Sequence, residues 1–164
     1  MEPAETPLEH RAHHLAGAIY GTILATTVVA ATASHPEDVS RPMVLVLGTS
    51  VVFWLAHVYA LGLAARMVAR RPLRRSEIIG LARSEWPMLQ SSGPILLVLL
   101  LGGLGVISPE QTANVALLVG IGALFTYGYI IGRQEHLSWF KVLLNALAAG
   151  CFGVAVLVLK LVVH

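Results

Sequence analysis

The chain has 164 residues, of which 56% are hydrophobic and 12% are charged, and its formal net charge is +2. So apolar a composition, with a mean hydropathy of +0.75, predicts a membrane protein and excludes a disordered tail, a coiled coil and a nucleic-acid-binding protein. The single cysteine, Cys151, lies inside an apolar run, so the chain offers neither a disulfide framework nor a cysteine-based metal site.

Five apolar stretches are long enough to cross a bilayer as helices, since a span needs about 20 mostly apolar residues. They cover residues 15–33, 43–65, 87–107, 113–131 and 139–163. None shows the alternation of polar and apolar residues that is typical of a membrane β-barrel strand. We therefore predict an all-α fold in which residues 1–164 form a single membrane domain, a polytopic bundle of five transmembrane helices.

The first stretch has an alternative interpretation as a secretion signal. Ala31, Thr32 and Ala33 form the small-x-small pattern of a signal-peptidase site. The segment before it carries three glutamates against one arginine, however, and the 19-residue apolar run exceeds the usual length of a signal-peptide core. We therefore expect this stretch to remain as a membrane helix.

The basic residues divide unevenly between the two sides of this bundle. The longest loop, 66–86, holds six arginines, and positive charge in short loops marks the cytoplasmic side. Placing this loop inside puts nine of the eleven basic residues inside and leaves only Arg41 and Lys160 outside. The predicted topology is N-in and C-out.

Segment 66–86 is also predicted to form a short amphipathic helix on the cytoplasmic surface, because its apolar residues recur at roughly helical spacing between charged ones. Ser84, Glu85 and Pro87 are typical of a helix start. The residues expected at anionic lipid headgroups are Arg70, Arg71, Arg74, Arg75 and Arg83. A simpler explanation is that these arginines serve only to set the membrane topology.

Glycine and proline predict where helices approach closely and where one is interrupted. Gly17 and Gly21 form one GxxxG pair, and Gly128 and Gly132 form another. Such faces let helix backbones approach each other, and we favour packing within the chain over packing between subunits. Pro94 should kink or interrupt the third span, and broken helices often line binding sites in transporters.

His57 is an ionisable residue well inside a predicted span, and such a residue is a functional candidate by default. It forms a seven-residue stripe with Ser50 and Ala64, so all three should face one direction. His57 and Ser50 are thus expected to border the same polar space. A neutral histidine that shares a hydrogen bond with a neighbouring helix is an equally weighted alternative.

Polar side chains gather in the half of the bundle assigned to the cytoplasm. They suggest the lining of a water-filled cavity that opens inward, with His57 at its deep end. The predicted lining consists of Tyr20, Ser50, Gln90, Ser91, Ser92, Tyr127 and Asn145. An aromatic belt and ordinary interhelical hydrogen bonds would account for part of the same asymmetry.

The HxxHH spacing of His10, His13 and His14 could place imidazoles on one helix face, as metal binding requires. It resembles one histidine box of the membrane fatty-acid desaturases and hydroxylases. Those enzymes need several boxes for two irons, and the other histidines here stand alone, so that interpretation fails on ligand number. A single site formed by His10, His14, His136 and Glu9 is left as a minor alternative to an interfacial polar cluster, and no cofactor is expected.

Several segments together resemble a group of small actinobacterial integral membrane proteins that have no assigned activity. They are His57 to Tyr59 at the end of span two, the arginine loop, Arg83 to Pro87 before span three, and the terminal Leu159 to His164. The resemblance implies a bacterial plasma membrane and no mechanism.

The function favoured by these residues is a channel or transporter for an ion or small solute, with His57 as gate or proton site. Histidine titrates near neutrality, which suits either role. We expect a homo-oligomer in the bilayer, because five short helices leave little room for a solute path. The alternatives are a non-catalytic accessory subunit that binds another membrane protein or anionic lipid and, third, a metal-dependent enzyme that uses His10 and His14.

Overall fold

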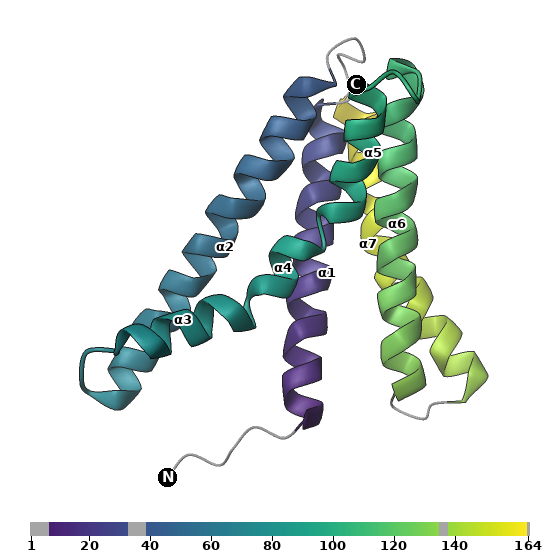
Figure 1. Cartoon of the computed structure of the whole chain (residues 1–164). Coiled ribbons are helices and arrows are strands. Elements are labelled where there is room, and N and C mark those ends of the chain that lie inside the picture. Colours follow the sequence, from purple (N-terminus) through teal and green to yellow (C-terminus); the bar gives the residue numbers. More distant parts are fainter. Residues whose placement is uncertain (1–6, 33–38, 135–137, 164) are drawn as a thin grey trace.

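The computed structural model describes residues 7–32, 39–134 and 138–163, and the regular structure in these ranges is entirely α-helical. The all-α prediction is confirmed for this part of the chain. The helices, in chain order, are α1 (Pro7–Thr32), α2 (Ser40–Ala69), α3 (Arg75–Ser84), α4 (Trp86–Gln90), α5 (Gly93–Gly103), α6 (Pro109–Gln134) and α7 (Trp139–Val163) (Figure 1).

Three of these helices are long and apolar enough to cross a membrane: α1 over His14–Thr32, α2, and α6. A fourth candidate is the segment from α3 to α5, in which Arg75–Gln90 and Gly93–Gly103 meet at an angle of 50°. In α7, which has 25 residues, the apolar stretch Trp139–Ala155 is shorter than the three candidate spans. The described residues therefore contain three candidate spans, or four if the bent pair crosses as one.

The third predicted span, 87–107, is not one continuous helix. Its first part is the short α4, and α5 has only 11 residues, which at 1.5 Å per residue covers about half of a hydrocarbon core about 30 Å thick. Pro94 lies in the first turn of α5 and has no N–H to bond the carbonyl of Gln90, so the helix breaks before it. The interruption expected near Pro94 is thus present.

The hydroxyls at this break replace part of the lost helical bonding. Ser91 donates from its hydroxyl to the carbonyl oxygen of Met88 at 2.8 Å, and Ser92 donates to that of Leu89 at 2.7 Å. Both serines are buried. The carbonyl oxygens of Met88 and Leu89 thus have hydrogen-bond partners at the break. Buried backbone carbonyls need such partners where no water reaches them.

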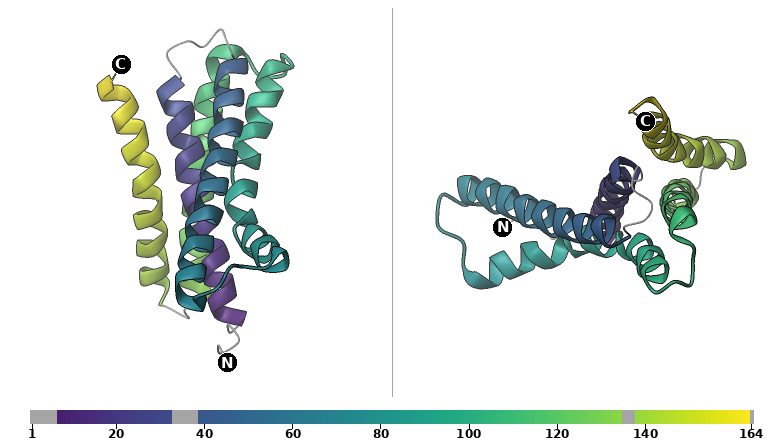
Figure 2. Two further views of the ribbon diagram at one scale, coloured as in Figure 1. Left: turned by 90° about the vertical axis from the view of Figure 1, so that its left-hand side faces the viewer. Right: turned by 90° about the horizontal axis from the view of Figure 1, so that it is seen from above.

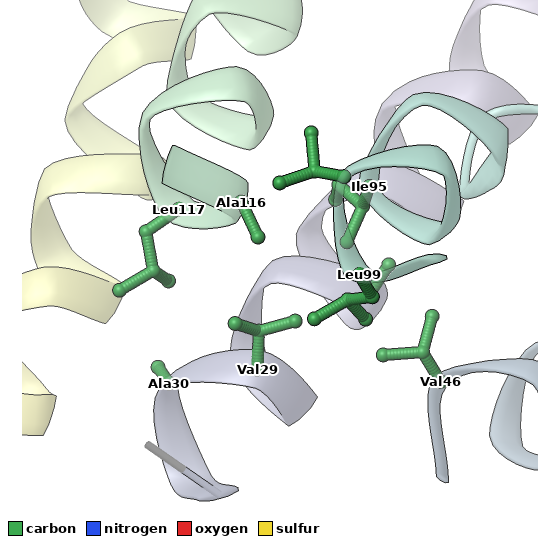
Figure 3. Packing of buried hydrophobic residues seen from close by; sticks show 9 residues of the cluster. Val29, Ala30, Val46, Ile95, Leu99, Ala116 and Leu117 are labelled. Carbon is green, nitrogen blue, oxygen red and sulfur yellow. The ribbon is translucent and has the colours of Figure 1, made fainter. Parts of the chain in front are cut away.

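Helix α1 is the centre of the arrangement and contacts α2, α4, α6 and α7. Seen from above, α2 and the segment formed by α3 and α4 extend from it in one direction, while α6 and α7 lie on its other side (Figure 2). The apolar core forms where α1, α2, α5 and α6 meet. Its fully buried members include Val29, Val46, Ile95, Leu99 and Leu117 (Figure 3).

The two glycine faces are used within the chain, as predicted. A Cβ atom on Gly21 would overlap the carbonyl oxygen of Met88 and the hydroxyl of Ser91, so α1 and α4 touch backbone to backbone. On α6, a Cβ on Gly128 or Gly132 would press against the backbone of α7. Small residues permit this approach, which yields dispersion contacts that larger side chains would prevent.

Helix α2 is the least enclosed of the candidate spans. Only 11% of its apolar window is buried, compared with 39% in α1 and 33% in α6. Its buried residues, Pro42, Val46 and Ser50, all lie in its first half, and the helix then diverges from α1 toward α3 (Figure 1). The helix continues four residues beyond the predicted end of the span at residue 65, to Ala69, and includes Arg66.

The basic residues gather at one end of the structure. The start of α1, the turn between α2 and α3, the end of α6 and the start of α7 share the lower end in Figure 1. Arg133 lies in the last turn of α6, and Lys141 lies near the start of α7. Arg41, near the start of α2, lies at the opposite end. The arrangement thus groups the charges as the sequence suggested.

The contact at Gly21 predicts a large position-specific effect of a single methyl group. We expect Gly21→Ala to lower the free energy of unfolding by about 1–3 kcal/mol, because the colliding atoms include a backbone oxygen that cannot move aside cheaply. Unfolding of the full chain in mixed detergent micelles would measure the change.

Gly48→Ala is the matched control, because a Cβ there meets nothing within 4 Å. Its effect should be within about 1 kcal/mol and stabilising, since alanine favours a helix over glycine. Equal effects of the two substitutions would contradict the close approach of α1 and α4.

Candidate functional site

The most unusual side chain in the interior is Glu85, at the joint between α3 and α4. Its backbone belongs to both helices, because its N–H donates to the carbonyl of Leu81 and its carbonyl accepts from the N–H of Met88. Its side chain is only 3% exposed. A carboxylate is costly to bury unless other polar groups compensate it, so its surroundings define a site.

His57 reaches this carboxylate from α2. Its Nε2 atom lies 3.5 Å from Oε2 of Glu85. The two side chains differ in accessibility, since 48% of the His57 side chain is exposed and Glu85 is enclosed. The contact is an ion pair only when the imidazole is protonated, and otherwise it joins a neutral ring and a carboxyl group. The protonation state of His57 therefore changes how α2 is held to the joint.

Trp54, one turn before His57, fixes α2 on both sides of the joint. Its Nε1–H donates to the carbonyl oxygen of Ala82 at 3.2 Å. Its ring meets that of Trp86 edge to face, with centroids 6.0 Å apart. Such a ring pair contributes about 0.5–1.5 kcal/mol beyond area burial. The ends of α3 and α4 that flank Glu85 are thus both attached to α2.

A second histidine lies at the same level on α1. Gly17 faces Met88, and Gly21 faces Met88 and Ser91, so α1 and α4 run in the same direction. His14 lies one turn before Gly17 on α1, and Glu85 lies one turn before Met88. By this register the two residues lie at a similar height. The Nε2 atom of His14 is buried. The structure gives Glu85 a contact with another titratable group, His57, so the site joins α2 to the joint of α3 and α4.

The cluster consists of one imidazole and one carboxyl group in contact. In the described part of the chain, no three histidine, cysteine, aspartate or glutamate side chains are placed to hold a metal ion. The proposed metal ligand His136 lies outside the described residues, as do the side chains of Glu9 and His10. The metal alternative thus gains no support from the residues whose positions are known.

The predicted cavity lining is distributed over several places. Ser50 is buried, and its hydroxyl has no hydrogen-bond partner among the described residues. Tyr20 is 47% exposed and its ring lies 6.4 Å from that of Phe53 on α2. Gln90 is exposed at the end of α4. These side chains and the two serines of the break belong to the α1, α2 and α4 side of the structure.

Two members of the predicted lining lie elsewhere. Tyr127 and Asn145 are half-buried on α6 and α7, and the backbone oxygen of Asn145 faces Gly128. The backbone of Asn145 is part of the contact between these two helices. The structure therefore brings His57 together with Glu85 and does not bring it together with Tyr127 or Asn145.

Sequence reasoning missed Glu85 as a partner of His57 because it treated this residue as part of a helix start. A usable signal was present. Span two ends and span three begins at the same side of the membrane, so residues shortly before the end of one and at the start of the other share a depth. By that argument His57 and Glu85 were candidates for pairing across two neighbouring helices.

The arginine segment has its own internal order. Arg71 donates to both carboxylate oxygens of Glu77, at 3.0 and 2.6 Å, and the backbone N–H of Arg74 donates to the same carboxylate at 2.6 Å. The side chain of Arg71 thereby closes the turn between α2 and α3. The remaining predicted headgroup residues, Arg70, Arg74, Arg75 and Arg83, are exposed.

No protein-family model, curated protein or solved structure matches the chain. The resemblance to small actinobacterial membrane proteins therefore stays a prediction, and the function must be argued from the site itself.

The hydrogen bonds of the turn between α2 and α3 predict a lowered pKa for Glu77. Hydrogen bonds from Arg71, and then from the Arg74 backbone, lower the pKa of Glu77 from 4.5 to about 2. A lowered pKa means that the carboxylate stabilises the turn fully above about pH 4.5, and that this contribution is lost as the pH falls through 2. Carbon NMR of labelled glutamate in the full chain would show the midpoint.

In Arg71→Gln the midpoint for Glu77 should rise most of the way toward 4.5, because the largest cause of the shift is removed. Arg83→Gln removes an equal charge from the other end of α3 and should leave the midpoint in place. A wild-type midpoint near 4.5 would show that the turn is open in solution.

Proposed function

We propose that the protein is a channel or transporter for a proton or a proton-coupled small ion, with Glu85 and His57 as the groups that hold the proton. The observation that carries this proposal is a buried carboxylate 3.5 Å from a half-exposed imidazole. The carboxylate lies shortly before a broken helix, and ionisable groups at such places mark proton and ion pathways in membrane proteins.

The pair can hold zero, one or two protons. With one proton it has no net charge, whether the imidazolium faces the carboxylate or a neutral ring faces the acid. A proton taken up at the exposed ring of His57 can therefore pass to the buried carboxyl group of Glu85 without creating a net buried charge. The exposed ring of His57 thus gives the buried carboxyl group of Glu85 a route for proton exchange with the surface.

We place the protein in a bacterial plasma membrane, with five spans and with the turn between α2 and α3 in the cytoplasm. The grouping of basic residues at one end supports this orientation by the positive-inside rule. The exposed apolar face of α2 supports assembly into a homo-oligomer, in which a second copy would complete the wall of a path beside His57.

The test is flux of protons and monovalent cations into proteoliposomes that contain the full chain, from pH 5 to 8. We expect wild-type flux to change across this pH range, in which histidine side chains gain and lose their proton. Glu85→Gln keeps the size of the side chain but cannot ionise, and His57→Ala removes the exposed ring. Both should reduce flux to the rate of protein-free vesicles.

Trp54→Phe is the control for a purely structural role. It loses the hydrogen bond to Ala82 but no titratable group, so it should weaken folding while the pH profile keeps its midpoint. Flux that is unchanged in His57→Ala and in Glu85→Gln, with both variants folded, would refute the proposal.

A second candidate is an accessory subunit, favoured by the low enclosure of α2. In that function α2 would pack against a helix of another membrane protein, and the pair of Glu85 and His57 would only hold α2 in position. Absence of flux in the folded wild type would favour this candidate.

A further inference from the structure

A groove on the surface lies between the second half of α2, the turn after it and α3. It encloses about 460 Å³, within the usual range for pockets that hold small molecules. Its walls are formed mainly by apolar side chains, among them Leu55, Tyr59 and Leu63 of α2 and Leu73 and Ile78 across from them. The occupant must therefore present an apolar part to α2 and α3.

Gly62 keeps the floor of the groove open. A Cβ atom there would lie 3.9 Å from a methyl carbon of Leu73 and 3.9 Å from one of Leu81, at ordinary contact distance. A longer side chain at this position would project between the two walls. Gly62 is thus the place where the groove can be filled by a single substitution.

One end of the groove carries a positive charge. Arg66 is part of the lining and lies one turn beyond Gly62 on α2. It is exposed, and none of its contacts within the described residues is an ion pair. Just past it, the turn carries the exposed Arg70 and Arg74. The groove is therefore apolar along its length and positively charged at one end. This combination suits an amphiphile with an anionic headgroup.

The depth of the groove in a bilayer agrees with this polarity. Helix α2 has 30 residues and is about 45 Å long, which exceeds a hydrocarbon core of about 30 Å. Its last turns, including Arg66, must then reach the headgroup region. Leu55 and Val58 lie two to three turns earlier and face the level of the acyl chains.

We propose that this groove binds one anionic phospholipid of the surrounding leaflet, with an acyl chain between α2 and α3 and the phosphate on Arg66. The site is separate from the pair of Glu85 and His57 and does not depend on the proposed transport. This proposal differs from a general attraction of arginines to the membrane, because it assigns the lipid headgroup to one arginine and the acyl chain to one groove.

The test is native mass spectrometry of the full chain, titrated in detergent with phosphatidylglycerol or phosphatidylcholine. We expect one phosphatidylglycerol to stay bound at concentrations where phosphatidylcholine does not. Arg66→Gln should weaken phosphatidylglycerol binding about fivefold, as expected for one arginine at an anionic headgroup. Arg83→Gln, with the same loss of charge outside the groove, should change it by less than about twofold.

Gly62→Leu should prevent binding of both lipids, because it fills the chain-binding part of the groove. If that variant does not fold, Ile78→Trp narrows the groove from an exposed position on α3 and should have the same effect. An excess of inorganic phosphate should not displace the lipid, since the acyl chain contributes much of the affinity.

Three results would overturn the proposal. Equal losses in Arg66→Gln and Arg83→Gln would mean a diffuse charge effect. Unchanged binding in folded Gly62→Leu and Ile78→Trp would place the lipid elsewhere. Displacement of the lipid by inorganic phosphate would make the anion itself the ligand.

Discussion

The close approach of α1 and α4 at Gly21 is the contact on which the rest of the arrangement depends. It is possible only because Gly21 has no Cβ where the Met88 carbonyl and the Ser91 hydroxyl lie. This contact holds the short α4 against the central helix, and Glu85 at the start of α4 is thereby enclosed. A helix of five residues has little stability of its own, so tertiary packing, and not local propensity, determines the geometry of the joint.

Helix α2 is held to this joint by a small number of contacts. Beyond Ser50 none of its described residues is buried, and the Trp54 hydrogen bond, the ring pair with Trp86 and the contact of His57 with Glu85 connect it to α3 and α4. A neutral hydrogen bond contributes about 0.5–1.5 kcal/mol and one to a charged group about 1.5–3. Protonation of His57, which turns its contact with Glu85 into an ion pair, therefore acts on one of the few contacts that position α2.

Hydropathy, glycine spacing and proline chemistry were sufficient to predict the all-helical fold, the contacts made by both glycine faces and the interruption near Pro94. They were insufficient to predict the length of α5, because hydropathy carries no information about serine hydroxyls that hydrogen-bond to backbone carbonyls. They were also insufficient to predict the extension of α2 to Ala69, because a helix can continue beyond its apolar residues. The partnership of Glu85 with His57 depends on how α2 lies against the joint of α3 and α4, where the Trp54 hydrogen bond and ring pair hold it. The shared depth of the two residues made the pair a candidate, but the contact itself follows from tertiary packing.

Helix α3 links the two proposed sites physically. Its Ile78 forms part of the lipid groove, while its Ala82 carbonyl receives the Trp54 hydrogen bond just before Glu85. Ten residues of helix move largely as one body, so a lipid that separates or draws together α2 and α3 also changes the approach of His57 to Glu85. Linkage between two such sites is reciprocal: a lipid that alters proton affinity at the joint must have its own affinity altered by the same factor when the joint is protonated. Arg66 would then act as more than a topology signal, because it would connect the composition of the leaflet to the charge state of the only buried ionisable side chain among the described residues.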